Sequence, residues 1–195
     1  MALPQLKMTL DDFVDWENEQ PERHIFYRGE IFAMNDGEVS AMAGVRKAHA
    51  HVTLNLGAAL NSPLRGTPCK PFITDVKLRI DAAETMFYPD IMVGCDPRDK
   101  KTPLHLAHPK LIIEVLSEST AAFDRGLKFI TCRRIDTLEE YALVDIDHRC
   151  VEVFRRNSDN QWVLHEFSGE ESVEFASVGL TLSAELLYEN VDIEE

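Results

Sequence analysis

The chain has 195 residues, of which 45% are hydrophobic, and a formal net charge of −14. This length and composition predict one globular domain over residues 1–195, and no apolar run is long enough to cross a bilayer. The N-terminal residues lack the charged and long apolar regions of an export signal, so we expect a cytoplasmic protein with no membrane partner.

The negative charge argues against nucleic acid as a partner, but it is unevenly distributed. Ten acidic residues and no basic ones follow Arg156, so the acidity is concentrated near an acidic C-terminal segment, 168–195. Between Arg98 and Arg134 there are eight basic and four acidic residues. That segment is either a phosphate-binding patch or an ordinary solvated loop and helix face, and the sequence does not distinguish the two.

Cysteine and histidine spacing gives no metal motif. The four cysteines form no Cys-x-x-Cys pair, which favours free thiols in a reducing cytosol. The pairs His49/His51 and His105/His108 lack cysteine or carboxylate neighbours at zinc spacing, so we expect no structural zinc site.

The first half of the chain predicts two helices and a hairpin. Residues 9–19 predict an amphipathic helix with Thr9 as N-cap, and residues 24–34 predict a hairpin that turns near Arg28-Gly29, with Glu30 opening its second strand. Residues 35–44 are rich in turn formers. Residues 46–62 have helical apolar spacing that ends at Asn61-Ser62-Pro63.

The second half predicts strands interrupted by one helix. The predicted elements are strands 70–80, 86–94, 110–117 and 139–146, a helix at 120–135 after the third of these strands, and a final hairpin of 150–156 and 161–167. The order helix, three strands, helix, strand predicts an α+β or α/β domain with a mixed sheet flanked by helices.

Two carboxylates stand out in these strands. Glu114 lies inside the apolar run LIIEVLS, and Asp90 begins the preceding strand. If the two strands are antiparallel neighbours, both carboxylates meet at one end of the pair and would repel each other without a cation between them. Hard oxygen ligands favour Mg²⁺ or Mn²⁺. A carboxylate bonded to backbone amides or to an arginine is an about equally good explanation of Glu114.

The following helix adds a cation. Ser117, Ser119 and Thr120 offer caps for it, and Lys128 on its face could return over the end of the strand. There it could stabilise negative charge on a phosphoryl group or orient the attacking water. Spacing alone favours a simpler reading, in which Asp124 and Lys128 form an i,i+4 surface ion pair.

Six segments in this order resemble one known family. They are GEIFAM (29–34), His49 followed by NL (55–56), YPDIMV (88–93), LIIEVLSEST (111–120), DRGLK (124–128) and EEYALVD (139–145). Together they resemble the bacterial Uma-two family of restriction-endonuclease-like proteins, within the PD-(D/E)XK nuclease superfamily. The resemblance covers roughly residues 10–170.

The resemblance implies a function and a site. It implies a PD-(D/E)XK core of order αβββαβ with an N-terminal helix and hairpin and a C-terminal hairpin, and a Mg²⁺- or Mn²⁺-dependent endonuclease that acts on DNA as a homodimer. The implied ligands are Asp90 and Glu114, with Glu30 as an outer ligand and Lys128 as the catalytic lysine. The implied supporting residues are His49, Ser117 and Asp124.

The chain departs from the family pattern in two places. Ile25 and Arg28 replace acids that usually precede the early glutamate, and Cys132 stands where a tyrosine is usual. The first departure concerns the outer acidic shell and not the core residues.

Two other functions remain open. One is a nuclease fold kept as a catalytically weak or inactive binding or oligomerisation module, which metal-binding calorimetry would distinguish from an enzyme. The other is a small-molecule hydrolase or carboxylate-based binding protein, which the absence of a Gly-x-Ser-x-Gly elbow, phosphate loop or dinucleotide fingerprint disfavours.

Overall fold

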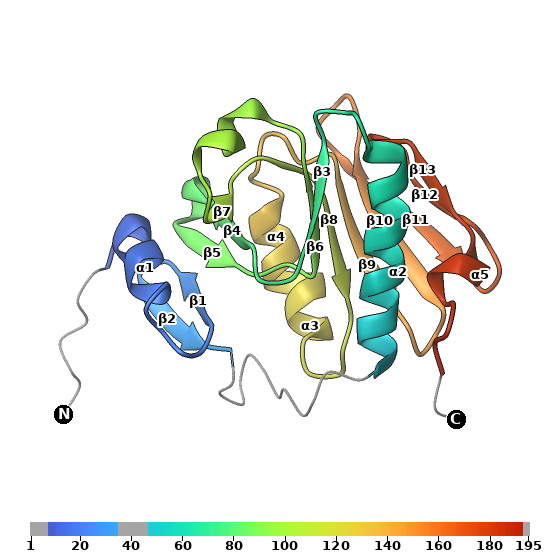
Figure 1. The fold of residues 1–195 in the computed structure, drawn as a ribbon, viewed down its shortest axis with the longest axis horizontal. Helices are drawn as coiled ribbons and strands as arrows, with labels where there is room; N and C mark the ends of the chain where they lie inside the picture. Colours follow the sequence, from blue (N-terminus) through green and yellow to red (C-terminus); the bar gives the residue numbers. More distant parts are fainter. Residues whose placement is uncertain (1–7, 35–46, 193–195) are drawn as a thin grey trace.

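A computed structural model describes residues 8–34 and 47–192. These residues form a mixed α+β fold with two mixed sheets and a small two-stranded sheet (Figure 1). The turn-rich stretch predicted at 35–44 lies outside the described residues.

The larger sheet has six strands in the order β11-β10-β9-β8-β6-β3. Its strands are β3 (Lys70–Ile73), β6 (Ile91–Gly94), β8 (Pro109–Val115), β9 (Glu140–Asp145), β10 (Cys150–Arg156) and β11 (Trp162–Ser168). Strands β8 and β9 run parallel, and the other neighbours run antiparallel. The predicted antiparallel pairing of the Asp90 and Glu114 strands is confirmed, because Ile91 lies opposite Ile113.

The second sheet has five strands in the order β2-β1-β5-β4-β7. Its strands are β1 (His24–Tyr27), β2 (Glu30–Ala33), β4 (Lys77–Ile80), β5 (Thr85–Phe87) and β7 (His105–Leu106). The predicted hairpin at 24–34 is confirmed, with four paired positions from His24 opposite Ala33 to Tyr27 opposite Glu30.

The prediction that residues 70–80 and 86–94 each form one strand was wrong. The 70–80 run divides into β3 and β4, and the 86–94 run divides into β5 and β6, so each run contributes to both sheets. The first division occurs where Thr74 and Asp75 adopt left-handed φ angles of 37° and 62°. The Thr74 amide donates to the Asp90 carbonyl at 2.9 Å, so the two chain crossings lie side by side. Asp90 is therefore in the connection between the sheets and not inside a strand.

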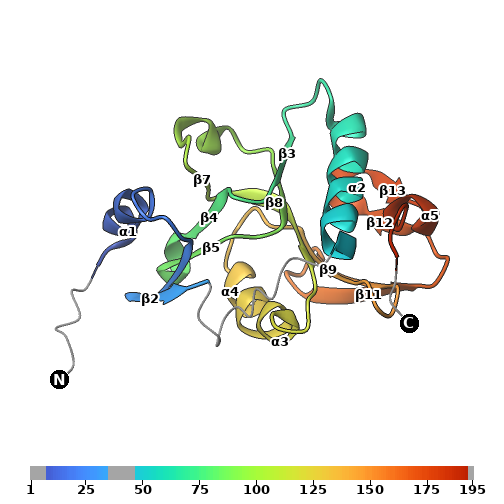
Figure 2. The same ribbon diagram turned by 60° about the horizontal axis from the view of Figure 1, so that its bottom comes forward.

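Helices cover both faces of the six-stranded sheet (Figures 1 and 2). On one face, α2 (Lys47–Leu64) buries Val52, Leu56 and Leu60 against the odd-numbered side chains of β8. On the other face, α4 (Phe129–Cys132) packs Phe129 and Cys132 with Ile112 of β8. Glu114 lies on this second face, because alternate side chains of a strand point the same way.

The helices depart from the predicted boundaries. Helix α2 continues through Pro63 to Leu64, because buried Leu64 extends its apolar stripe. The predicted 120–135 helix is α3 (Ala121–Phe123), a π-helical segment (Asp124–Lys128) and α4, and it ends at Cys132. Helix α1 (Leu10–Glu17) has the predicted Thr9 N-cap.

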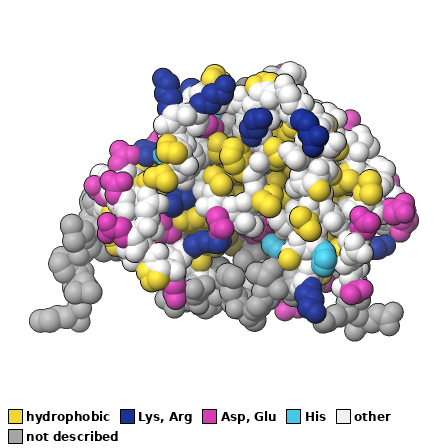
Figure 3. Space-filling model, in the orientation of Figure 1, with side chains coloured by type: hydrophobic (Ala, Val, Ile, Leu, Met, Phe, Trp, Pro, Cys, Tyr) yellow, Lys and Arg dark blue, Asp and Glu magenta, His cyan; other side chains and the backbone are white. Residues whose placement is uncertain are grey.

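The C-terminal part was only partly predicted. The β10–β11 hairpin is confirmed, but β12 (Val173–Phe175), β13 (Leu180–Leu182) and α5 (Ala184–Leu187) were missed. The buried Val173, Phe175 and Leu187 extend the core beneath α2. On the face in Figure 3, acidic side chains gather at the two ends of the molecule and hydrophobic ones lie in the middle.

The expectation of four free thiols was wrong. Cys69 and Cys95 form a disulfide, because they flank the paired residues Lys70 and Gly94 of β3 and β6. Cys132 and Cys150 are free. Within residues 8–34 and 47–192, no helix has the length and apolar character needed to cross a membrane.

Candidate metal centre

The candidate site lies at the end of β8, where the chain crosses between the two sheets. Asp90 immediately precedes β6, and Glu114 is the penultimate residue of β8. The antiparallel register Ile91–Ile113 continues to these two positions and brings the two carboxylates together. The antiparallel pairing on which the expected proximity depended is thus present in the fold.

The Asp90 and Glu114 carboxylates each accept a hydrogen bond from a backbone amide of the other's chain segment. The Asp90 amide donates to Glu114 Oε2 at 3.3 Å, and the Val115 amide donates to Asp90 Oδ2 at 2.8 Å. The Glu114 side chain is only 2% exposed, whereas that of Asp90 is 23% exposed. The Glu114 carboxylate is therefore fixed inside the core, and the Asp90 carboxylate is partly exposed.

Lys128 neutralises the buried carboxylate. Its Nζ lies 2.8 Å from Glu114 Oε1 and 3.3 Å from Asp124 Oδ1, and it donates to the Tyr88 carbonyl at 3.5 Å. Lys128 and Asp124 are both buried. The simple reading of an i,i+4 surface pair is therefore wrong, because the pair is not on the surface and includes Glu114.

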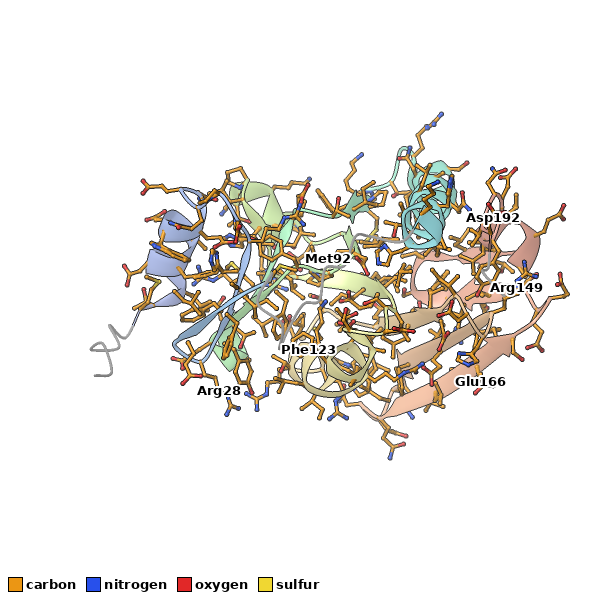
Figure 4. All side chains as sticks on the ribbon, turned by 90° about the horizontal axis from the view of Figure 1, so that it is seen from below. Arg28, Met92, Phe123, Arg149, Glu166 and Asp192 are labelled. Atoms are coloured by element: carbon orange, nitrogen blue, oxygen red, sulfur yellow. A yellow bond between two sulfur atoms is a disulfide. The ribbon has the colours of Figure 1, made fainter. Side chains whose placement is uncertain are left out.

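The helical geometry explains this placement. Asp124 and Lys128 are the first and last residues of the π-helical segment, a wider turn that is often found at functional sites. The Tyr141 hydroxyl, from β9, donates to the Asp124 carbonyl at 3.0 Å and holds the segment against the sheet. In Figure 4, Phe123 of the preceding α3 lies between Arg28 and Arg149.

His49 completes the cluster from α2, on the opposite face of the sheet. Its Nε2 lies 3.5 Å from Asp90 Oδ2. Burial by itself lowers the pKa of His49, but the hydrogen bond and charge of Asp90 outweigh it and raise the pKa above its ordinary value. Burial raises the pKa of Asp90, but His49 and Lys128 lower it by a larger amount. The pKa of Asp90 is therefore below its ordinary value, which favours the ionised carboxylate.

Burial disfavours the charged forms of both Glu114 and Lys128, and the attraction between the two groups favours them. Burial raises the pKa of Glu114 well above its usual range, with Lys128 acting against it and Asp124 and Asp90 adding to it. Burial lowers the pKa of Lys128, but Glu114, Asp124 and Asp90 more than compensate and raise it. These charges favour the ammonium form of Lys128, which has three acidic groups, Glu114, Asp124 and Asp90, around it.

The donor set fits a hard divalent cation. Mg²⁺ commonly uses one or two carboxylates and keeps several waters, and the Asp90 carboxylate is partly exposed beside Glu114. No group of three or more His, Cys, Asp or Glu side chains surrounds a common ion position within the described ranges. Water and substrate oxygens would therefore have to complete the coordination.

Two other predicted residues have different positions. Ser117 Oγ accepts the Thr120 amide at 3.3 Å, but the N-cap residue of α3 is Thr120, which makes no side-chain cap hydrogen bond. Glu30 begins β2, the outermost strand of the five-stranded sheet, and its side chain is exposed. Its role as an outer ligand stays a prediction.

Sequence reasoning missed Tyr88 and Glu17. The Tyr88 hydroxyl donates to Glu17 Oε1 at 2.7 Å, and its carbonyl accepts from Lys128. A signal was present for Glu17, because an acid in the last turn of a helix opposes the helix dipole and needs another reason to be there.

Comparisons with known proteins agree with this fold. The family model Uma2, described as "Putative restriction endonuclease", matches residues 10–186. In Synechocystis sp. (strain ATCC 27184 / PCC 6803 / Kazusa), the "Uncharacterized protein slr1290" is 30% identical over 187 residues, which cover 96% of this chain and 94% of that protein. The "Uncharacterized protein sll1609" is 33% identical over 172 residues, 87% of this chain and 93% of that protein.

A solved structure has the same architecture. The crystal structure of "a putative nuclease belonging to DUF820" from Anabaena variabilis ATCC 29413 superposes with a TM-score of 0.70 at 21% identity. The match covers 93% of this chain and 97% of that chain, and at this identity it bears on the fold alone. The family match extends over most of the chain and includes every residue of the cluster, so this protein belongs to the Uma2 family of "Putative restriction endonuclease" proteins.

Proposed function

We propose that this protein is a Mg²⁺-dependent endonuclease that hydrolyses phosphodiester bonds, with DNA as the expected substrate. The observation that carries the proposal is the meeting of Asp90, Glu114 and Lys128 at one sheet end, with Lys128 Nζ at 2.8 Å from Glu114 Oε1. The chain order α2, β3, β6, β8, α3–α4, β9 supports a PD-(D/E)XK-type core.

The residues have separate tasks in this proposal. Asp90 and Glu114 would hold Mg²⁺ or Mn²⁺, which when bound lowers the pKa of a water and polarises a phosphate. Lys128 supplies a positive charge beside the position that a phosphate would take at the two carboxylates, so it would stabilise negative charge that develops on the phosphate. His49 holds a proton close to Asp90 Oδ2, and Asp124 keeps Lys128 charged.

The proposal also concerns cell compartment and assembly. Cleavage of both strands requires two sites, which supports a homodimer. A cytoplasmic location is proposed from the N-terminal sequence alone, because the Cys69–Cys95 disulfide removes the argument from free thiols. Neither feature is needed for the chemistry of a single site.

Cleavage of supercoiled plasmid DNA with Mg²⁺ or Mn²⁺ tests the proposal. Asp90→Asn and Glu114→Gln should each reduce cleavage by at least about 100-fold, since a metal centre supplies several kcal/mol of transition-state stabilisation. Circular dichroism checks that both variants fold.

Two control variants remove matched carboxylates elsewhere. Asp99 accepts the Ala107 and His108 amides at 3.0 and 3.1 Å in the loop before β8, so Asp99→Asn matches Asp90→Asn. Glu140 is buried in neighbouring β9, so Glu140→Gln matches Glu114→Gln. Undiminished cleavage by both site variants, or equal losses in the controls, contradicts the proposal.

One observation favours a second candidate function, a nuclease fold used for binding without catalysis. Both Glu114 oxygens are engaged by Lys128 and the Asp90 amide, and a cation would have to compete with them. Calorimetric titration with Mn²⁺ decides between the two, because a binding module predicts no heat of metal binding and no ion-dependent rise in melting temperature.

A further inference from the structure

A buried network joins the N-terminal helix to the segment that carries Asp90. Glu17, the last residue of α1, has a side chain that is only 2% exposed. Its Oε1 accepts the Tyr88 hydroxyl at 2.7 Å and the His24 amide at 2.8 Å, and its Oε2 lies 3.0 Å from His24 Nδ1. Because the Glu17 carboxylate is buried and hydrogen-bonded to these groups, it holds the Tyr88 hydroxyl in one position.

Tyr88 is held at both ends. Its hydroxyl binds Glu17, and its carbonyl accepts from Lys128 Nζ at 3.5 Å. Two cations flank its ring, with the Arg23 guanidinium at 5.8 Å and Lys77 Nζ at 6.0 Å from the ring centroid. Lys77 is itself buried and donates to Asn18 Oδ1 at 2.8 Å, so the surroundings of the ring are also fixed.

The position of Tyr88 in the chain gives this network its consequence. Residues 88–90 form the crossing from β5 in one sheet to β6 in the other, and only Pro89 separates Tyr88 from Asp90. The proline restricts its own φ and the backbone of the preceding residue. An anchor at Tyr88 therefore limits where the Asp90 carboxylate can lie.

We propose that Glu17 and Tyr88 are positioning residues, which hold Asp90 in register with Glu114 and Lys128 through the 88–90 crossing. This inference rests on the proposed function for its consequence in metal binding, and it goes beyond it by giving α1 a role at the site. Neither residue needs to touch a metal or a substrate. Groups that support metal ligands in this way contribute strongly to affinity in other proteins.

Four variants separate positioning from ordinary packing. Tyr88→Phe removes the hydroxyl, Glu17→Ala removes the acceptor, and Glu17→Gln keeps an acceptor oxygen. Phe13→Leu is the packing control, because Phe13 is fully buried between α1 and β1, with its ring 5.1 Å from that of Phe26, and has no part in the network.

Two measurements are made on each variant of the full chain. Calorimetric titration with Mn²⁺ gives the metal dissociation constant. Amide hydrogen exchange by NMR gives the protection of the Val115 amide, which donates to Asp90 Oδ2, relative to the Ile113 amide in the same strand. The exchange measurement reports where Asp90 lies without any metal.

We expect Tyr88→Phe and Glu17→Ala to weaken Mn²⁺ binding about tenfold, the lower end for lost supporting contacts. The Val115 amide should exchange about fivefold faster relative to Ile113, the factor for one hydrogen bond of ordinary strength. Glu17→Gln should keep both the Mn²⁺ affinity and the Val115 protection close to their wild-type values, and Phe13→Leu should change neither. A double variant, Glu17→Ala/Tyr88→Phe, should show no larger effect than Tyr88→Phe alone.

Unchanged Val115 protection in Tyr88→Phe and Glu17→Ala overturns the inference, as does an equal effect of Phe13→Leu. If the wild-type protein shows no heat with Mn²⁺, the proposed function fails, and the exchange data alone decide the positioning role. Accelerated Val115 exchange that Glu17→Gln reverses would then support the inference without any metal chemistry.

Discussion

Asp90 and Glu114 are joined by a reciprocal arrangement, in which each carboxylate accepts a hydrogen bond from a backbone amide of the other's chain segment. Glu114 Oε2 accepts from the Asp90 amide, and Asp90 Oδ2 accepts from the amide of Val115, the residue after Glu114. The two bonds close a ring across the end of the β6–β8 pair. They hold two acidic groups together before any cation is considered, because backbone amides offset part of the repulsion.

Replacement of Lys128 should destabilise the fold strongly. In Lys128→Met the buried Glu114 loses its cation, and the loss of one partner from a buried pair costs about 3–5 kcal/mol. Urea unfolding followed by circular dichroism measures the effect. The double variant Glu114→Gln/Lys128→Met removes both charges and should recover much of the loss. If the double variant is as unstable as Lys128→Met, the instability comes from lost packing and not from an unpaired charge.

The His49–Asp90 contact should make stability depend on pH. The pKa of His49 is raised in the folded protein, so its ion pair contributes fully below the unfolded pKa of about 6.5 and is lost as pH rises through the folded value. In metal-free protein, His49→Gln should therefore cost more stability at pH 6 than at pH 9, by roughly 1 kcal/mol or less for a partly exposed pair. A difference that is equal at both pH values would show that His49 acts through packing alone.

Reduction of the Cys69–Cys95 disulfide should lower stability. The two cysteines are 26 positions apart, and the closure of a loop of this size contributes about 3.5 kcal/mol in the chain-entropy account. The free energy of unfolding in urea, measured with and without dithiothreitol, checks this value. Cys69→Ser/Cys95→Ser should match the reduced protein and be insensitive to reductant, and Cys132→Ser should keep the full response.

Glu140 should hold the C-terminal strands on the large sheet. Its carboxylate is fully buried, pairs with Arg155 Nε at 2.7 Å, and accepts the Ala176 and Ser177 amides at 3.1 and 2.9 Å. Glu140→Ala leaves these donors without an acceptor, which should cost about 3 kcal/mol. Limited proteolysis should then cut first near 169–179. Cleavage that begins in the N-terminal hairpin instead would contradict this role.

The sequence predicted the proximity of Asp90 and Glu114 on one condition, that their two segments pair as antiparallel neighbours. The apolar run LIIEVLS placed Glu114 near the end of one strand and Asp90 at the start of the preceding one, and the observed register brings them together. The N-cap of Thr9 and the two hairpins were predicted because each depends on residues close in sequence. The identity of the cation and the role of Glu30 stay predictions.

Other features required the tertiary structure. The 70–80 and 86–94 runs each have the composition of one strand, and their division between two sheets follows from packing and from left-handed Thr74 and Asp75. The Cys69–Cys95 disulfide follows from cross-strand pairing, which Cys spacing cannot reveal. Strands β12 and β13 gain their stability from burial beneath α2 and from Glu140, both far away in sequence.

By itself, the sequence determined which acidic and basic groups the protein carries and the local elements that present them. Only the tertiary structure decided that Lys128 is buried against Glu114, that His49 reaches Asp90 from the opposite helix, and that Glu17 anchors Tyr88. These contacts join residues 14 to 71 positions apart. Their energies depend on burial, and burial is a property of the whole packed chain.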